Sequence, residues 1–266
     1  MLQFLRSLFS AAHSEHQPAV PAGQRVYAIG DIHGRLDLFN ALIAAIEVDD
    51  AEATPARSTV ILLGDLVDRG PDSAGVVRRA RQWQDAREVR ILAGNHEEMF
   101  LKSFDSTDML RHFLRHGGRQ TIHSYGVDRR TLSAADIDEV QDLMCAAVPQ
   151  VDRDYITGFE DLIVLGDYVF VHAGIDPEVS IHEQRVSDLR WIREPFLSHS
   201  EPYELIVVHG HTISEAPELR GNRIGIDTGA YASGRLTALV LEGTTRRLIE
   251  AAATEEGPIT VSKRAA

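Results

Sequence analysis

The apolar residues of the first hundred positions form short runs that alternate with stretches of helical periodicity. Each run has the length of a buried strand, and the runs occupy residues 25–30, 58–63 and 88–92. In the segments that follow them, apolar residues recur every three or four positions, at 36–47, at 73–85 and beyond residue 96. A strand followed by a helix, repeated three times, is typical of a parallel sheet covered by helices. The pattern therefore predicts the α/β class.

The pattern changes between residues 105 and 148. Two helix-like stretches, 109–125 and 133–148, follow one another there with no strand-like run between them. This predicts a helical cap inserted into the sheet-forming chain. Strand-like runs then return, at 162–165, 168–172, 205–209, 223–226, 236–241 and 247–251.

The two ends of the chain are expected to lie outside the main domain, which we place at residues 25–254. Residues 1–24 form an arm and linker in this interpretation, with a short interfacial helix as the alternative for the first ten residues. That apolar stretch is too short to span a bilayer, and no basic segment precedes it as in a signal peptide. The polar tail at 255–266 is expected to be loose.

The composition indicates a soluble globular protein and argues against several kinds of binding partner. A length of 266 residues with 44% hydrophobic residues suits one large soluble domain with a buried core. The formal net charge of -13 argues against binding to nucleic acid or insertion at an anionic membrane. A single cysteine, Cys145, excludes an internal disulfide and a cysteine-based zinc site, so a reducing cytoplasm is the expected compartment.

Polar clusters follow the predicted strands at their ends. In open α/β sheets, ligands bind beyond the carboxyl ends of the strands. Taken singly, each cluster has an ordinary explanation as a turn, a surface ion pair, a helix cap or a satisfied histidine. Five such coincidences of residue type and position favour a common site. The clusters are GDIHG at 30–34, GDLVDRGP at 64–71, GNHE at 94–97, VFVHAG at 169–174 and IVVHGHT at 206–212.

The order D-x-H-G, G-D-x-V-D-R-G, G-N-H-E, H-A-G and G-H resembles that of the calcineurin-like metallophosphoesterases over residues 25–243. The second motif, with its arginine, and the third motif, with its glutamate, resemble the corresponding motifs of the phosphoprotein phosphatase branch of this family. That branch includes bacterial and phage serine/threonine phosphatases and symmetrical diadenosine tetraphosphate hydrolases. The resemblance implies a β-sandwich flanked by helices (α/β/β/α) that carries the helical insertion.

The resemblance also implies a ligand set for two divalent metal ions, with Asp65 shared between them. One ion would be held by Asp31, His33 and Asp65, and the other by Asp65, Asn95, His172 and His211. Mixed carboxylate, amide and imidazole ligands suit Mn²⁺, which we expect, or iron or Zn²⁺, rather than Ca²⁺. Bound cations would also reverse the negative field of this acidic protein around a phosphate ester.

The same resemblance implies catalytic roles for three neighbouring residues. His96 would give a proton to the leaving oxygen, Asp68 would orient His96, and Arg69 would clamp the phosphate. A hydroxide held between the two metals would attack phosphorus directly, without a phosphoenzyme.

Several residues fit this pattern less closely. Ile213 stands where many metallophosphoesterases have a further histidine, which agrees with the phosphatase branch. His209 is extra: it could support a ligand or contact phosphate, or simply end a strand facing solvent. Arg193 is our candidate for a second phosphate-binding arginine, with Arg190 as its rival, and Tyr231 is a candidate substrate contact.

The remaining aromatic and imidazole side chains receive structural interpretations. Trp83 and Trp191 are expected to pack in the core rather than to contact substrate. His112, His116 and His123 of the predicted cap are expected on a solvated face, with the lining of a substrate entrance as the alternative.

Three functions remain open from the sequence. The leading interpretation is a serine/threonine-type protein phosphatase acting on a phosphorylated protein. The alternative is a hydrolase of dinucleoside polyphosphates such as diadenosine tetraphosphate. A non-catalytic metal-binding homologue is disfavoured by the presence of His96 and Arg69. The oligomeric state is not fixed by any of these features.

Overall fold

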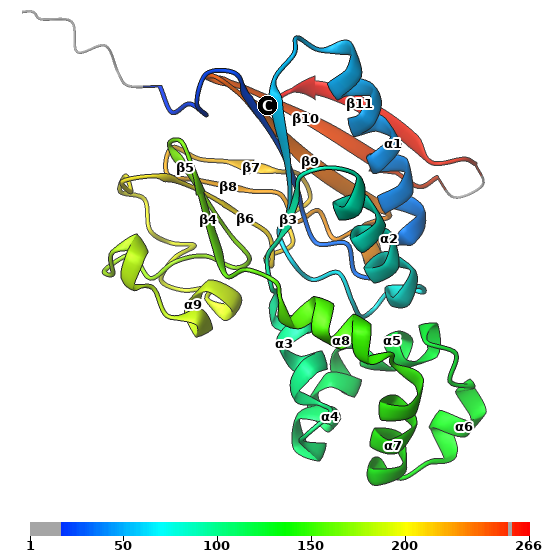
Figure 1. The fold of residues 1–266 in the computed structure, drawn as a ribbon. Coiled ribbons are helices and arrows are strands. Elements are labelled where there is room, and N and C mark those ends of the chain that lie inside the picture. The colour runs from blue at the N-terminus through cyan, green and yellow to red at the C-terminus, as the bar shows by residue number, and fades with distance from the viewer. Residues whose placement is uncertain (1–16, 255–256) are drawn as a thin grey trace, which may run out of the picture.

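Two packed β-sheets with helices on their outer faces form the main body of the protein (Figure 1). The computed structural model describes residues 17–254 and 257–266. The first sheet has the strand order β11-β10-β9-β1-β2-β3, and the second has the order β4-β5-β6-β8-β7. This arrangement confirms the predicted α/β/β/α class.

The first sheet is built around the three strands predicted at the start of the chain. β1 (Gln24–Ile29) pairs in parallel with β2 (Arg57–Leu62), which pairs in parallel with β3 (Val89–Ile91). β9 (Arg235–Glu242) and β10 (Thr245–Ala252) extend the sheet on the other side of β1 by antiparallel pairing.

The outer face of the first sheet is covered by α1 (Leu36–Glu52) and α2 (Ser73–Ala86) (Figure 1). Leu38, Leu42 and Ile46 of α1 repeat at helical spacing and are fully buried in the core between helices and sheet. The strands contribute alternate residues to their two faces. Tyr27 faces this core, whereas Val26 faces the second sheet, which explains why β1 is apolar from Val26 to Ile29.

The second sheet contains β4 (Leu162–Leu165), β5 (Tyr168–Val171), β6 (Ile206–His209), β8 (Arg223–Gly225) and the short β7 (Glu218–Leu219). Its inner face packs on the first sheet through Phe170 and Val208. A smaller cluster that includes Phe196 and Val207 buries the outer face beneath η2 (Ile181–Glu183) and α9 (Val186–Trp191). The two-residue strand β7 was not predicted.

The predicted helical insertion is present and is divided into more pieces than its periodicity indicated. After α3 (Asn95–Lys102), none of the described residues between 103 and 161 forms a strand (Figure 1). The helices are α4 (Thr107–Phe113), a π-helical turn η1 (Leu114–Gly118), α5 (Arg119–Ser124), α6 (Arg129–Ala134), α7 (Ile137–Ala147) and α8 (Gln150–Thr157). Phe113, Ile122 and Met144 of these helices join the core that lies under α1 and α2.

The described parts of both ends are more ordered than we expected. The prediction of a loose tail is wrong, because β11 (Thr260–Ala265) pairs antiparallel with β10 along the whole strand. The side chains of β11 are exposed, and pairing through the backbone at a sheet edge does not require apolar residues. No apolar pattern in the sequence therefore indicated this strand. Val20 of the predicted linker is buried, and its N–H donates to the Gly243 carbonyl.

The expectations for the first ten residues lie outside the described part of the chain. Among the residues that are described, no helix is both long enough and apolar enough to cross a membrane.

Candidate dinuclear metal centre and active site

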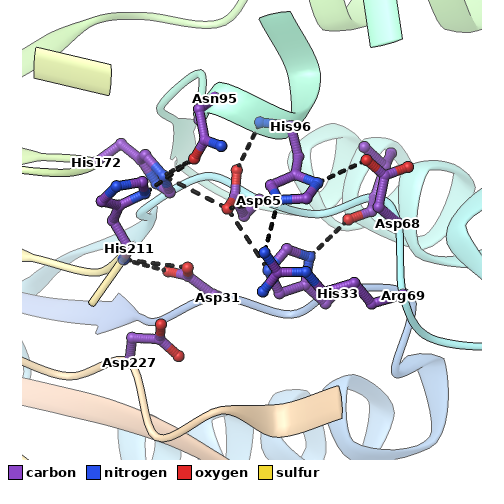
Figure 2. A network of polar contacts seen from close by, with 12 residues as sticks. Asp31, His33, Asp65, Asp68, Arg69, Asn95, His96, His172, His211 and Asp227 are labelled. Carbon is purple, nitrogen blue, oxygen red and sulfur yellow. Dashed lines mark hydrogen bonds and ion pairs between the residues drawn. The ribbon is translucent and has the colours of Figure 1, made fainter. Parts of the chain in front are cut away.

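The five predicted clusters come together at the carboxyl ends of β1, β2, β3, β5 and β6 (Figure 2). Each lies in the loop or helix start that directly follows its strand. β1, β2 and β3 end at one edge of the first sheet, and β5 and β6 end at one edge of the second. The packing of the two sheets brings these edges together, so that Asp31 and His211, 180 residues apart, are in contact.

The backbone of this edge is strained where the predicted site residues lie. Within the described residues, the non-glycine residues with positive φ are His33, Asp65, Asp68, Arg69 and His211, with φ between 45° and 74°. This left-handed conformation is unfavourable for residues that carry a Cβ atom. Strain of this kind persists where the surrounding structure fixes the backbone, and it concentrates at functional sites.

His33 is oriented to offer one lone pair to a cation. Its Nδ1–H donates to the Val67 carbonyl at 2.8 Å, so the lone pair of the neutral ring is on Nε2. Nε2 is buried without a hydrogen-bond partner and lies 3.5 Å from Oδ2 of Asp65. Burial lowers the pKa of His33 well below its usual value, which keeps the ring neutral and able to bind a metal.

A second group of lone pairs converges on the other side of Asp65. His172 donates from Nδ1 to the Leu63 carbonyl at 2.8 Å, so its Nε2 also carries a lone pair. That Nε2 lies 3.0 Å from Oδ1 of Asn95 and 3.5 Å from Oδ2 of Asp65. His211 places its Nδ1 2.9 Å from the same Asn95 oxygen.

The short distances between these acceptor atoms indicate whether the site can hold two cations. Acceptor atoms that face one another at about 3 Å repel unless a cation or proton lies between them. Burial lowers the pKa of His172 and lowers that of His211 to about 3, so both rings are neutral near pH 7. His172 has its one N–H on Nδ1, which leaves only a lone pair on Nε2 to face the Asn95 oxygen. The donor set therefore fits a divalent metal at each cluster, with Asp65 belonging to both.

Asp65 carries the negative charge at the centre of the site. Burial alone would raise its pKa, but the surrounding histidines hold that pKa below its usual value, so the carboxylate is ionised. Its Oδ1 also accepts the N–H of His96 at 3.0 Å. Gly94 leaves room for this side chain, because a Cβ atom there would lie 2.1 Å from Oδ1.

Asp31 has an acidic neighbour that the sequence interpretation did not include in the site. Asp227 follows β8 and points toward Asp31 from below (Figure 2). Burial and the charge of Asp227 raise the pKa of Asp31 well above its usual value, and burial raises the pKa of Asp227 to about 6. An acidic residue at the end of the apolar run at 223–226 was the available signal, because it repeats the pattern of Asp31 and Asp65.

Glu97 lies in the first turn of α3, and its carboxylate also binds backbone groups outside that helix. Its carboxylate accepts the backbone N–H groups of Gly94, Asp65 and Leu66 at 2.7–2.9 Å. It thereby fixes the two loops that carry Asp65 and Asn95. Burial and the charge of Asp65 raise the pKa of Glu97 to about 7.

His96, Asp68 and Arg69 lie together beside this centre (Figure 2). His96 donates from Nδ1 to Oδ2 of Asp68 at 2.6 Å, and its Nε2 lies 3.0 Å from Nη2 of Arg69. Burial alone would lower the pKa of His96, but the carboxylates of Asp65 and Asp68 outweigh it and raise that pKa.

A cavity of about 400 Å³ opens over the centre. Its wall contains the catalytic candidate His96, the two arginines Arg69 and Arg193, and the partly exposed rings of Trp191 and Tyr231. The lining residues are Asp65, Arg69, Asn95, His96, Met99, His116, Trp191, Arg193, His211, Ile213 and Tyr231.

Of the candidate substrate contacts, Arg193 and Tyr231 line the cavity, whereas Arg190 and His209 do not. Arg193 lines it, whereas Arg190 lies in ion pairs with Asp161 and Glu98. Tyr231 also lines it and stacks under Arg69, whose Cζ is 4.7 Å from the ring centroid. His209 does not reach the cavity. Its buried ring packs on Phe196 at 5.0 Å, with Nδ1 bonded to the Gly210 carbonyl, and it does not face solvent.

Two side chains of the wall correct the structural interpretations made from the sequence. Trp191 is 37% exposed and lines the cavity instead of packing in the core. His116 reaches the cavity from the helical insertion, as the alternative for the cap histidines predicted. Trp83 is buried beside Phe39, as expected.

Comparison with known protein families identifies the class. The family model of the calcineurin-like phosphoesterases matches residues 24–232, which contain every predicted metal ligand and catalytic candidate. This chain belongs to that family, and it is a metal-dependent phosphoester hydrolase.

Several relatives of this chain are named as dinucleoside tetraphosphatases. The chain is 27% identical over 232 residues to the asymmetrical bis(5'-nucleosyl)-tetraphosphatase PrpE of Bacillus velezensis, covering 79% of this chain and 86% of that protein. It is 30% identical over 214 residues to the symmetrical bis(5'-nucleosyl)-tetraphosphatase of Escherichia coli, covering 79% and 64%. A symmetrical enzyme of Acidovorax is 34% identical over 158 residues, but the match covers only 47% of its length.

Solved structures support the fold. A protein provisionally assigned as a diadenosine tetraphosphatase superposes with a TM-score of 0.59 at 21% identity, covering 93% of this chain and 98% of that chain. The cold-active protein-tyrosine phosphatase of a psychrophilic Shewanella gives a TM-score of 0.51 at 19% identity, covering 87% and 80%.

Proposed function

We propose that this protein hydrolyses dinucleoside polyphosphates, with bis(5'-nucleosyl) tetraphosphates as the substrate class. The observation that carries this proposal is the composition of the cavity wall. Arg69 and Arg193 offer charge to a chain of phosphates beside the metal ligands, and Trp191 and Tyr231 offer flat rings at the same cavity. Polyphosphate and nucleobase are the two chemical parts that such a wall recognises. The names of the relatives support the same class.

The proposed metals are two divalent ions, Mn²⁺ first, with iron or Zn²⁺ as alternatives. Asp31, His33 and Asp65 would hold one, and Asp65, Asn95, His172 and His211 the other. The ligand atoms of Asp65, His172 and His211 lie within 4.8 Å of one another, as do those of His33, Asp65 and His96, whereas Asp31 has Asp227 as its charged neighbour. When bound, the metals supply an activated water as nucleophile and neutralise charge on the phosphate.

The protein's own residues would then complete the transfer. Arg69 and Arg193 bind phosphate oxygens and hold the phosphorus in line for attack. As the bond between phosphorus and the leaving oxygen breaks, Nε2 of His96 gives its proton to that oxygen. Asp68, bonded to Nδ1, stabilises the charged imidazolium before this step and fixes the direction of Nε2.

The second candidate is the function that the sequence favoured, a serine/threonine-type protein phosphatase. The observation in its favour is the formal charge of -13, which opposes a polyanionic nucleotide more than a phosphopeptide with one phosphate. The metal ligands and His96 would serve either substrate. The difference between the two functions therefore lies in the outer wall of the cavity, where Trp191 and Tyr231 favour the nucleotide.

A parallel assay of the Mn²⁺-loaded protein on diadenosine tetraphosphate and on a phosphoserine peptide tests the proposal. We expect the dinucleotide to be cleaved with the larger kcat/KM. Two molecules of ADP would indicate symmetrical cleavage, and ATP with AMP asymmetrical cleavage. A larger kcat/KM on the peptide would establish the protein phosphatase instead.

The proposed compartment is the cytoplasm. The exposed, unpaired thiol of Cys145 supports a reducing environment, and a nucleotide substrate is consistent with it.

A further inference from the structure

The helical insertion reaches the partner of the proton donor through one buried hydroxyl. Thr121 of α5 donates from Oγ1 to Oδ1 of Asp68 at 2.6 Å. The backbone N–H of Asp68 donates back to the same Oγ1 at 2.9 Å. Oδ2, the second oxygen of Asp68, receives Nδ1–H of His96. Thr121 thus occupies the one carboxylate oxygen that His96 leaves free.

The direction of these hydrogen bonds follows from the chemistry of the groups. An ionised carboxylate only accepts, so the Thr121 hydroxyl must donate to Asp68. Its lone pairs then accept the Asp68 N–H and the hydroxyl of Ser73, whose Oγ lies 3.0 Å away. Ser73 in turn accepts the Asp68 N–H at 3.0 Å. Thr121, Asp68 and Ser73 are all fully buried, so water does not compete for these bonds.

The same part of the insertion is fixed against the loop that carries Asp68 and Arg69. The Arg69 N–H donates to the Gly117 carbonyl at 3.2 Å. Gly117 has a φ of +108°, and a Cβ atom there would lie 2.6 Å from the Arg69 nitrogen. Only glycine allows this approach, and it breaks the helix just before α5. The backbone contact and the Thr121 hydroxyl therefore act on adjacent residues of one loop.

We propose that Thr121 is a positioning residue of the active site, and that the helical insertion is through it a part of the proton-donor assembly. The inference rests on the proposed role of His96. Without the hydroxyl, Oδ1 of Asp68 is a buried acceptor that has lost its hydrogen bond from Thr121. The carboxylate then turns toward another donor, and the imidazole bonded to its second oxygen turns with it. Thr121 does not line the cavity, so the chemical step is affected and substrate binding is not.

A double-mutant cycle on the Mn²⁺-loaded full chain tests this inference. Thr121→Val removes the hydroxyl at nearly constant volume, Thr121→Ser restores it, and Asp68→Asn removes its target. Ser103→Ala is the matched control, because Ser103 is also a buried hydroxyl close to α3 but bonds only the Met99 carbonyl. The substrates are diadenosine tetraphosphate and phenyl phosphate. The second is included because its leaving group, phenol, needs a proton.

We expect Thr121→Val to lower kcat on phenyl phosphate about 10-fold, as part of the ~10²–10⁴-fold that a general acid contributes, with KM within about twofold. Thr121→Ser and Ser103→Ala should stay near wild type. In the Asp68→Asn background, Thr121→Val should have no further effect. A kcat near wild type for Thr121→Val, or an undiminished loss on top of Asp68→Asn, would overturn the inference.

Two further controls keep the result decisive. Thr121→Ala replaces the valine variant if circular dichroism shows that the latter does not fold. A wild type that cleaves phenyl phosphate but not the dinucleotide would contradict the proposed substrate, while the cycle on phenyl phosphate would still test Thr121.

Discussion

Nη2 of Arg69 lies 3.0 Å from Nε2 of His96, on the opposite side of the imidazole from Asp68. A guanidinium only donates hydrogen bonds, so Nε2 must accept, and the ring is neutral in this arrangement. Arg69 therefore covers the atom that is proposed to carry the proton. A phosphate that draws Arg69 away leaves Nε2 free to bind a proton and turn it toward the leaving oxygen. In the proposed mechanism, this contact would link phosphate binding to the availability of His96 as the acid.

The proton-donor role predicts a loss of turnover without a loss of metal. His96→Asn should lower kcat by about 10²–10⁴-fold, the usual contribution of a general acid. Metal content, measured by elemental analysis, should stay at the wild-type value, because His96 is not one of the proposed ligands, although a nitrogen of its ring lies within 4.8 Å of the ligand atoms of His33 and Asp65. Full activity of this variant on an alkyl phosphate ester would show that another group gives the proton.

Asp65 is predicted to couple the two metal sites. Its carboxylate lies 3.5 Å from the free nitrogen of His33 and 3.5 Å from that of His172. Asp65→Asn should therefore reduce the binding of both ions together and abolish activity, as measured by calorimetric titration with Mn²⁺. If one ion still bound with wild-type affinity, Asp65 would belong to a single site.

The pKa values of the acidic pair predict how metal binding depends on pH. Asp227 has a pKa of about 6, and that of Asp31 is also raised, so in the metal-free protein the pair holds protons that the metals must displace. Affinity for Mn²⁺ should rise as the pH increases through about 6, with protons released on binding. Calorimetry in buffers of different ionisation enthalpy measures that release, and Asp227→Asn should reduce it.

The same raised pKa values affect the stability of the metal-free protein. Between about pH 4 and 6, Asp31 and Asp227 bind more protons in the folded state than in the unfolded state, so their contribution to the free energy of unfolding should fall as the pH rises through this window. The buried rings of His33, His172 and His211 contribute with the opposite sign, because folding lowers their pKa values. Urea unfolding of the metal-free wild type and of Asp227→Asn at pH 5 and pH 7 would isolate the contribution of the pair. Between these pH values the wild type should lose more free energy, or gain less, than the variant. An identical change in both proteins would mean that the pair is ionised in the folded state.

Glu97 is predicted to contribute more to the stability of the fold than Glu98 does. Glu97→Ala leaves the buried N–H groups of Gly94, Asp65 and Leu66 without their acceptor, at a cost of about 3 kcal/mol or more in the free energy of unfolding. Glu98→Ala removes partly exposed ion pairs and should cost about 1 kcal/mol or less. Equal values in urea unfolding would contradict this role.

The two arginines of α9 and its following loop give a matched pair for substrate binding. Arg193→Met should lower kcat/KM on the dinucleotide about 10-fold, since a charge-assisted bond to phosphate contributes roughly 1.5–3 kcal/mol. Arg190→Met should leave kcat/KM within about threefold of wild type, because Arg190 is bonded to Asp161 away from the cavity. The opposite ranking would assign the phosphate contact to Arg190.

The sequence by itself determined the class of fold and the proposed metal ligands. Strand periodicity and strand-end polar residues are local patterns, and the carboxyl ends of parallel neighbouring strands meet at one edge of a sheet. Asp31, Asp65 and Asn95 could therefore be assigned to one site before their distances were known. His172 ends a strand of the second sheet, so its assignment came from the order of the motifs instead. The order of the motifs added the family, which the family match confirmed.

Only the tertiary structure decided which side chains surround those ligands. Asp227, Glu97 and Thr121 act through partners more than 25 residues away in the chain, and no local pattern specifies such a pairing. The ordered tail shows the same limit, because β11 is held by backbone hydrogen bonds that any side chain permits. Trp191 and Arg193 line the cavity, whereas Arg190 does not, and which of these neighbours faces the site depends on how α9 packs on the second sheet through Leu189.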